Sequence, residues 1–285
     1  MQIFKTIENM RAASRMARHA GKRVGFVPTM GALHEGHLSL VRASKAQSDV
    51  VAASIFVNPT QFGPNEDFSK YPRTFERDCE LFTKEGVELL FAPTVDEMYP
   101  AGAVTYVTVE GMSEQLCGKS RPGHFRGVTT VVSKLFNIVE PAIAFFGQKD
   151  AAQVAIIRRM VRDLNIPVEI AVCPIVREAD GLAMSSRNAY LDPQQRKAAL
   201  VLHRALQEVQ RQFKLGESNA SNLIEHGRQV FAQEPSVRLD YLEIVNTENL
   251  EALGKIECPA LVAVAAYLGK TRLIDNFILY GKSVS

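Results

Sequence analysis

Short, almost wholly apolar runs alternate with amphipathic stretches over the first two thirds of the chain. The run at 50–57, Val-Val-Ala-Ala-Ser-Ile-Phe-Val, is apolar enough for a central strand that is covered on both faces. Similar runs stand at 24–27, 87–93, 142–146 and 168–173, with helical patterns between them. This alternation predicts the α/β class, with a parallel sheet, right-handed crossovers and helices on both faces.

Capping and turn residues mark where the helices between these runs begin and end. Thr6 is a predicted N-cap, and the helix after it carries Ile7 and Met10 on one face and closes at Gly21. An edge strand is predicted at 104–109, where apolar and polar residues alternate. Four further helices are predicted at 38–48, 74–86, 128–139 and 151–164.

The pattern changes after the fifth apolar run. Residues 177–188 form a long loop of small and polar residues, and Pro193 then opens an amphipathic helix that should extend to Leu215. Another helix and three strands are predicted at 218–232, 239–245, 261–268 and 272–278. We therefore expect a Rossmann-like domain over residues 1–176, and a smaller C-terminal α+β domain over 177–285 with the loop at its start.

Composition excludes several classes of protein. The chain has 285 residues, of which 46% are hydrophobic and 22% charged, as in an ordinary soluble globular protein. Its 33 basic residues are scattered and its net charge is +2, so we expect no nucleic-acid partner. No apolar run is long enough to span a membrane. The four cysteines are widely separated, which indicates reduced thiols in a cytoplasmic protein.

The most informative stretch is the corner at 28–37, Pro-Thr-Met-Gly-Ala-Leu-His-Glu-Gly-His, between a predicted strand and a predicted helix. Gly31 and Gly36 allow the backbone to turn tightly and to approach a ligand closely. His34 and His37 stand where the N-terminus of a helix presents N–H groups and the positive end of its dipole, which favours phosphate. With two imidazole donors, this corner predicts a site for a polyphosphate whose charge rises during a reaction.

Two other interpretations of this corner stay open from the residues alone. Glycine-rich strand-to-helix turns are common in α/β proteins, and a His-x-x-His pair is often only a pair of polar residues at the surface. A metal site would need further ligands, and only Glu35 stands nearby. We therefore expect no metal ion that is held by protein ligands.

A second candidate segment is the loop 58–65, which follows a buried strand. Parallel sheets bind ligands at the carboxyl ends of their strands, and this loop carries amides, among them Asn58 and Gln61, at that edge. Turn formation explains Asn58 equally well, and an ordinary solvated loop explains Gln61 equally well.

Three further segments carry groups that suit phosphate. The corner 147–150, Gly-Gln-Lys-Asp, offers a lysine and a helix-capping aspartate. The loop 121–127 contains two arginines and a histidine, and the loop 177–188 contains two serines and an arginine at its centre. A solvated loop and an interdomain linker are the simpler interpretations of the last two.

Taken together, these segments resemble a known family. The string at 34–37, His-Glu-Gly-His, resembles the His-x-Gly-His motif of the nucleotidyltransferase superfamily, and 184–187, Met-Ser-Ser-Arg, resembles the mobile Lys-Met-Ser-Lys-Ser-type loop paired with it there. The longer strings resemble those of the pantoate–beta-alanine ligase family, and they stand at 28–37, 56–62, 71–74, 145–150 and 177–190. The resemblance covers essentially the full chain.

The resemblance implies a reaction in two steps. The carboxylate of pantoate attacks the α-phosphate of ATP and gives pantoyl-adenylate and pyrophosphate. The amine of beta-alanine then attacks the adenylate and gives pantothenate and AMP. Two alternatives are a superfamily enzyme that adenylates a phosphate-bearing substrate, and a nucleotide-binding regulator without turnover.

The resemblance also implies which residues act. Catalytic roles fall to His34, His37, Lys149 and Arg187. The expected ATP-binding residues are Met30, Gly31, Ala32, Leu33, His34, Glu35, Gly36, His37, Gly147, Gln148, Lys149, Asp150, Val176, Met184, Ser185, Ser186 and Arg187. The expected residues for pantoate and beta-alanine are Pro28, Thr29, Asn58, Gln61, Tyr71, Arg121 and Gln153.

Finer roles follow from the same family motifs. Asp150 is expected at the ribose, and Val176 and Met184 on the adenine side. The segment from Met184 to Asn188 is expected to close over the adenylate and exclude water. Mg²⁺ is expected with ATP, bound through phosphate oxygens and water rather than named protein ligands. No bound organic cofactor is expected, and the family implies a homodimer.

Overall fold

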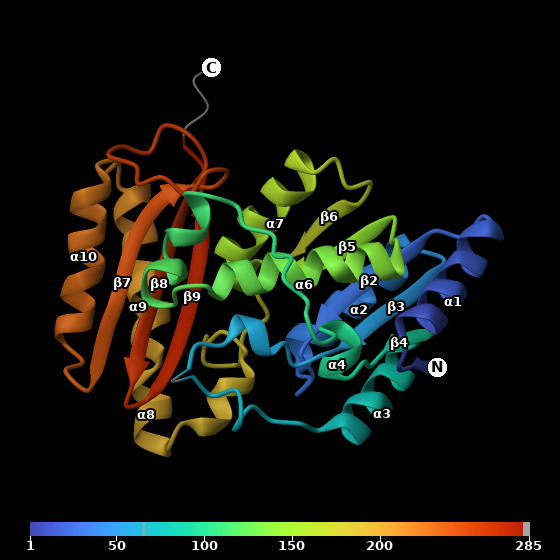
Figure 1. Cartoon of the computed structure of the whole chain (residues 1–285). Coiled ribbons are helices and arrows are strands. Elements are labelled where there is room, and N and C mark those ends of the chain that lie inside the picture. The colour runs from blue at the N-terminus through green and yellow to red at the C-terminus, as the bar shows by residue number, and fades with distance from the viewer. Residues whose placement is uncertain (65, 282–285) are drawn as a thin grey trace. The chain divides into compact units, whose positions relative to one another are not determined.

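The computed structural model describes residues 1–64 and 66–281, and its elements are labelled in Figure 1. The chain forms two compact units, each assembled from segments that are separate in the sequence. The first unit contains 1–113, 121–147 and 156–174, and the second contains 114–120, 148–155 and the chain from Ile175. The predicted domain boundary after residue 176 stays a prediction.

A six-stranded parallel sheet forms the centre of the first unit. Its strands are β1 (Gln2–Phe4), β2 (Val24–Thr29), β3 (Val50–Ile55), β4 (Leu89–Phe91), β5 (Ile143–Gly147) and β6 (Glu169–Cys173). The strands pair in the order β1-β4-β3-β2-β5-β6, which confirms the predicted parallel sheet. Strand β1 is an addition to the predicted set, because three residues are too few to show a period.

Helices flank this sheet, as the alternating pattern predicts. They are α1 (Ile7–His19), α2 (Glu35–Gln47), α3 (Phe75–Glu85), α4 (Val95–Met98), α6 (His124–Val139) and most of α7 (Ala151–Asp163). Helix α1 contacts α6, and α2 contacts α3. Completely buried side chains, among them Val27, Val41, Phe82 and Phe145, fill the core that α2 and α3 share with the strands.

Two helices begin earlier than their apolar patterns predict. Helix α2 begins at Glu35 because His34 acts as its N-cap, and α6 begins at His124 after Gly123, whose φ is 82°. The predicted starts, residues 38 and 128, mark only where the apolar face begins. The histidine-bearing turns are therefore the first turns of helices rather than loops.

The predicted edge strand at 104–109 is wrong. This segment runs as irregular chain with Val104 82% exposed and Tyr106 50% exposed. Its backbone bonds to threonine hydroxyls of α6 instead of a strand: Val107 N donates to Thr130 Oγ1 at 3.0 Å, and Thr129 Oγ1 donates to Val107 O at 2.6 Å. Alternation alone therefore misled the strand assignment.

The second unit is built on a three-stranded antiparallel sheet. Its strands are β7 (Val237–Asn246), β8 (Ala260–Leu268) and β9 (Thr271–Leu279), paired in chain order. Helices α9 (Leu200–Lys214) and α10 (Ala220–Ala232) pack together against this sheet, as Figure 1 shows. The remaining short elements are α5 (Cys117–Ser120), α8 (Pro193–Ala198) and the 3₁₀ turns η1 (Pro59–Gln61), η2 (Met112–Glu114), η3 (Gln148–Asp150) and η4 (Ser186–Tyr190).

The single helix predicted from Pro193 to Leu215 is instead two helices. The chain is interrupted at Ala199, where Leu202 N donates to Ala199 O at 3.2 Å in a tighter three-residue turn. Ala199 is completely buried, so the apolar pattern continues across the break. The sequence period cannot reveal an interruption of this kind.

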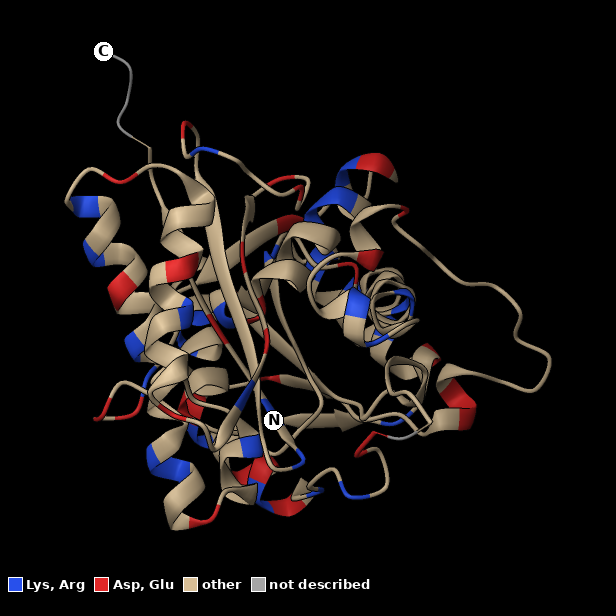
Figure 2. Cartoon of the chain, turned by 90° about the vertical axis from the view of Figure 1, so that its left-hand side faces the viewer, with Lys and Arg blue, Asp and Glu red and all other residues tan. Residues whose placement is uncertain are grey.

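In Figure 2, positions of Lys and Arg alternate with positions of Asp and Glu along the helices and loops. Among the residues that the structure describes, no helix is both long and apolar enough to cross a bilayer.

Candidate functional site

The two histidines of the 28–37 corner hold the first turn of α2 together. The His34 Nδ1 atom accepts a hydrogen bond from Gly36 N at 3.1 Å. In return, His37 Nδ1 accepts one from His34 N at 3.3 Å. The two rings lie with their centroids 4.1 Å apart. This reciprocal capping fixes both imidazoles at the N-terminus of α2.

The capping also decides where each neutral imidazole carries its proton. A ring nitrogen that accepts a hydrogen bond from a backbone N–H is unprotonated, so in both His34 and His37 the proton stands on Nε2. Each ring therefore has a donor at Nε2, beside the positive end of the helix dipole. An anion at this terminus would meet the Nε2–H donors of the two imidazoles and the positive end of the helix dipole.

A buried carboxylate holds the turn that precedes these histidines. Asp78, on α3, is 1% exposed, and its two oxygens accept hydrogen bonds from Ala32 N and Leu33 N, both at 2.9 Å. Thr74 Oγ1 donates to the same carboxylate at 3.2 Å. The turn needs this support because Gly31 and Ala32 have positive φ values, 79° and 50°.

Space around the turn explains the glycine at position 31. A Cβ on Gly31 would lie 2.9 Å from Asp78 Oδ2, too close for a side chain. A cavity of about 280 Å³ adjoins the turn and is lined in part by Met30, Gly31, Thr74 and Asp78. The turn is therefore fixed mainly by hydrogen bonds to Asp78. Asp78 stands 45 positions beyond Leu33 and in no motif, so the sequence gives no sign of this role.

Replacing Asp78 with asparagine should destabilise the first unit. The amide nitrogen would face a backbone N–H of the turn, so at least one buried donor loses its acceptor at a cost of about 2 kcal/mol in the free energy of unfolding. Urea denaturation measures this cost. The same change at Asp163, an exposed partner of Arg159, should leave the free energy of unfolding almost unchanged, and equal effects at the two positions would contradict the role of Asp78.

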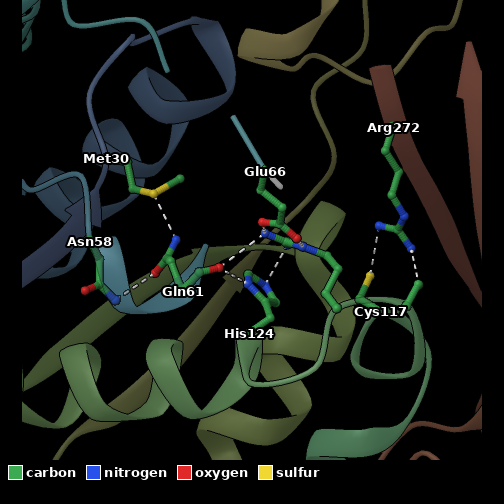
Figure 3. Close-up of polar contacts among 9 residues, drawn as sticks. Met30, Asn58, Gln61, Glu66, Cys117, His124 and Arg272 are labelled. Carbon is green, nitrogen blue, oxygen red and sulfur yellow. Dashed lines mark hydrogen bonds and ion pairs between the residues drawn. The ribbon is translucent and has the colours of Figure 1, made fainter. Parts of the chain in front are cut away.

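Asn58 and Gln61 of the 58–65 loop form one connected group, drawn in Figure 3. Asn58, 1% exposed, donates from Nδ2 to Gln61 Oε1 at 3.2 Å and to Gly127 O at 3.1 Å. Its Oδ1 accepts from the hydroxyls of Thr60 and Tyr99, both at 2.9 Å. The whole amide of Asn58 is thus engaged within the protein, so it orients the side chain of Gln61.

Gln61 also bonds to the 28–37 corner. Its Nε2 donates to Met30 Sδ at 2.9 Å, which brings two expected substrate residues into contact. Tyr71, 5% exposed, packs edge-on to Phe62 with ring centroids 5.9 Å apart. Thr29, whose Oγ1 donates to Ser54 O at 2.7 Å, is buried below the corner. Met30 and Gln61 are therefore better placed to meet a ligand than Thr29.

The basic segment at 121–127, which includes the first turn of α6, is balanced by an acidic residue that no sequence motif marks. Arg121 donates from Nε and Nη2 to the two oxygens of Glu66, at 2.7 and 2.6 Å. His124 Nδ1 lies 2.8 Å from Gln61 O, and its Nε2 lies 3.0 Å from Arg121 Nη1 (Figure 3). Because a carbonyl only accepts, Nδ1 is the protonated nitrogen of His124. The group thus fixes the backbone of Gln61.

The Glu66–Arg121 pair should make the first unit sensitive to acid. Burial raises the pKa of Glu66, but the hydrogen bonds and charge of Arg121 outweigh it and hold this pKa below the ordinary 4.5. Because the pKa of Glu66 is lower in the folded state, its carboxylate stabilises the fold above pH 4.5. This contribution to stability is lost as the pH falls through the folded-state pKa. We therefore expect wild type to have a larger free energy of unfolding than Glu66→Gln at neutral pH. This difference should shrink on acidification, which thermal melts of both proteins between neutral and acid pH would show. A constant difference would contradict the pairing.

Residues 148–150 of the 147–150 corner form the turn η3, which belongs to the second unit. Lys149 lies on this turn with its side chain 21% exposed, and its Nζ stands 4.0 Å from Asp150 Oδ1. Gln153 follows in the first turn of α7 and belongs to the same unit. Gly147 is the last residue of β5 and belongs to the first unit.

The 177–190 segment is closely tied within the second unit. Met184 N donates to Val176 O at 3.0 Å, which makes the two expected adenine-side residues neighbours. Ser185 caps η4 by accepting from Arg187 N at 3.2 Å. Glu178 binds Asn188 Nδ2 at 2.7 Å across the loop. The loop is therefore a structured hairpin-like segment rather than a plain linker.

The structure thus groups the expected site residues by unit. The first unit carries the reciprocal histidines and the Met30–Gln61–Asn58 group, together with Tyr71 and Arg121. The second unit carries Lys149, Gln153, Val176, Met184, Ser185, Ser186 and Arg187. Within residues 1–64 and 66–281, no group of three or more His, Cys, Asp and Glu side chains is arranged to hold a metal ion.

Comparison with known proteins gives consistent results across the chain. The sequence model of the family described as pantoate-beta-alanine ligase matches residues 2–278. A pantothenate synthetase of Koribacter versatilis is 60% identical over 279 residues, which cover 98% of this chain and 96% of the relative.

Solved structures give the same result. The crystal structure of pantothenate synthetase from Thermus thermophilus superposes with a TM-score of 0.92 at 48% identity, covering 97% of this chain and 99% of that one. A pantoate-beta-alanine ligase from Francisella tularensis, complexed with beta-gamma ATP and beta-alanine, has a TM-score of 0.80 at 35% identity and covers 98% of this chain and 97% of its own.

Proposed function

The chain belongs to the pantoate-beta-alanine ligase family, and on that premise we propose how its residues divide the reaction. It is an ATP-dependent ligase that joins pantoate to beta-alanine. The reaction runs through pantoyl-adenylate: the pantoate carboxylate attacks the α-phosphate of ATP and pyrophosphate leaves. The amine of beta-alanine then attacks the acyl carbon and releases AMP.

The observation that carries this proposal is the pair of capping histidines. A carboxylate and a triphosphate repel each other, so the site must offset negative charge before the two can react. His34 and His37, held with their protons on Nε2, supply donors to the phosphates without being charged themselves. His37 stabilises the charge that develops on the phosphates in the transition state.

The amides bind the acid substrate. Gln61, oriented by Asn58 and fixed through its backbone by His124, donates from its amide nitrogen to the carboxylate oxygens of pantoate and accepts at its amide oxygen from a pantoate hydroxyl. Gln153, in the second unit, is also assigned to pantoate, and Met30, assigned to ATP, accepts a hydrogen bond from Gln61 at its sulfur. Tyr71 and Arg121 stand around the same substrates, with Asn58 as a positioning residue.

The second unit binds the nucleotide. Lys149 neutralises the phosphates that leave as pyrophosphate, and Asp150 binds the ribose. Val176 and Met184 contact the adenine, and the segment from Ser185 to Arg187 closes on the phosphates and keeps water from the acyl-adenylate.

Mg²⁺ accompanies ATP in this proposal. Such an ion binds mainly to phosphate oxygens and water, so the proposal needs no protein cluster of ligands, and Mg²⁺ would add charge neutralisation to that of Lys149. We also propose that the enzyme is a cytoplasmic homodimer, as the family resemblance implies. Light scattering of the purified protein tests the dimer.

Order of product release tests the proposal. ATP, Mg²⁺ and pantoate should give pyrophosphate without beta-alanine, and free AMP should accumulate only after beta-alanine is added. A protein that ignores pantoate and adenylates a phosphate-bearing compound would belong to the other branch of the superfamily. A protein that ATP stabilises against heat without any product would be a nucleotide-binding regulator.

A further inference from the structure

Two consecutive buried residues of β9 bind both of the segments that the proposed function assigns to the phosphates. The first contact is made by Asn276, which is 3% exposed. Its Nδ2 donates to two main-chain carbonyls of η3, Gln148 O at 3.0 Å and Lys149 O at 2.8 Å. Its Oδ1 accepts from Gln148 Nε2 at 3.0 Å. Every hydrogen of this amide is thus used to hold the turn that carries Lys149.

The second contact is made by Asp275, also 3% exposed. Its carboxylate binds Arg177 in a two-pronged ion pair, with Nη1 at 2.7 Å and Nη2 at 2.9 Å. Asp275 Oδ1 also accepts from Asn276 N at 2.8 Å, which links the two contacts. Arg177 is the first residue of the 177–190 segment, so Asp275 fixes the base of the loop that bears Ser185 and Arg187.

We propose that Asp275 and Asn276 form a shared anchor that positions Lys149 and the 177–190 segment for adenylation. Neither residue contacts substrate in this proposal, and both act through the segments they hold. The inference rests on the proposed function, because it takes Lys149 as the phosphate lysine. It adds that this lysine is held by β9 of the second unit, although β5 precedes it in sequence.

The short length of η3 is the physical reason for an anchor. The turn η3, Gln148–Asp150, is a single 3₁₀ turn between β5 and α7, and the hydrogen bonds of such a turn have poorer geometry than those of an α-helix. Lys149 carries a long side chain, and a displacement of its backbone by about 1 Å can lower a rate by about a hundredfold. A buried amide that holds two consecutive carbonyls limits such movement.

Asn276→Asp is the sharpest substitution, because it keeps the shape of the side chain and replaces a donor by an oxygen. That oxygen would face the carbonyls of Gln148 and Lys149 and repel them. We expect pantoate-dependent pyrophosphate release to fall by about tenfold or more. Capture of added pantoyl-adenylate by beta-alanine releases no pyrophosphate, so it should change by less than about threefold.

A double-mutant cycle with Lys149→Ala separates positioning from general damage to the fold. If Asn276 acts through Lys149, then Asn276→Asp should slow pyrophosphate release little further, within about twofold, once Lys149 is alanine. The proposal is overturned if the rate losses of the two single variants multiply in the double variant. It is also overturned if Asn276→Asp slows pyrophosphate release and the capture of pantoyl-adenylate equally. If Asn276→Asp does not fold, Asn276→Ala enters the same cycle with the same criteria.

Asn219→Asp is the matched control. Asn219 is exposed in the same unit and caps α10, where aspartate caps equally well, so this variant should keep both half-reactions. The outcomes also separate the anchor from the proposed function. A wild-type protein without pantoate-dependent pyrophosphate release rejects the function, whereas an active wild type with multiplicative losses rejects only the anchor.

Discussion

An enzyme in which His37 is replaced by alanine is expected to release pantoate-dependent pyrophosphate at least about a hundredfold more slowly than wild type. The substitution removes a donor at Nε2 that the capping of α2 orients toward an anion at the helix terminus. Single-turnover measurements of pyrophosphate release would give the rate. The loss should appear in this rate more than in the dissociation constant of ATP, because the donor acts on charge that develops during the reaction.

His37 caps α2 in the structure and is also proposed to act in catalysis, so the two roles must be tested separately. Loss of the cap costs about 1 kcal/mol of folding stability. His37→Gln should keep most of that stability, since glutamine at this position caps helices well, yet it should remain at least about tenfold slow. A glutamine variant with the wild-type rate would show that the site needs only the cap. His19→Ala, on the exposed end of α1, should have no effect.

Replacing Lys149 with alanine is expected to have an effect of similar size, on the order of a hundredfold in pyrophosphate release. The lysine is partly buried and lies beside the aspartate expected at the ribose, so its loss removes a positive charge from the phosphates. Capture of added pantoyl-adenylate by beta-alanine should fall much less, because pyrophosphate has then already left.

Lys255→Ala is the control for this charge. Lys255 is an exposed lysine of the second unit paired with Glu257, and its removal should leave both half-reactions unchanged. A Lys149→Ala enzyme as fast as this control would remove Lys149 from the mechanism. Lys149→Arg should recover only part of the rate, because a planar guanidinium presents its donors in a different geometry.

Much of the fold follows from local patterns in the sequence. The runs at 24–27, 50–57 and 142–146 are almost wholly apolar because both faces of their strands are covered, and this pattern alone predicts a parallel sheet. Where tertiary contacts replace local ones, the prediction fails. The segment 104–109 alternates like a strand, but the hydroxyls of Thr129 and Thr130 satisfy its backbone.

The residues of the candidate site are likewise predictable only in part from the sequence. Short strings identify His34, His37 and Lys149, because glycines, histidines and lysine at a strand-to-helix corner have a direct chemical meaning. The residues that hold them in place are distant in sequence and carry no motif. Asn276 is 127 positions from Lys149, and nothing in the chain around it indicates that its amide would meet η3. Such supports become visible only in three dimensions.

The capping pair shows what the structure adds to a motif. The string His-Glu-Gly-His predicts imidazoles near phosphate, but it does not say which ring nitrogen carries the proton. The hydrogen bonds from Gly36 N and His34 N settle this by occupying both Nδ1 atoms. The division of roles between His34 and His37 remains a proposal that the His37 variants test.

The central claim is that the carboxylate of pantoate attacks the α-phosphate of ATP. The most direct measurement uses pantoate with both carboxylate oxygens labelled with ¹⁸O, followed by mass spectrometry of the products after beta-alanine is added. Attack at the α-phosphate places one labelled oxygen in AMP and leaves the other in the amide of pantothenate. Unlabelled AMP, formed alongside pantothenate, would contradict the account.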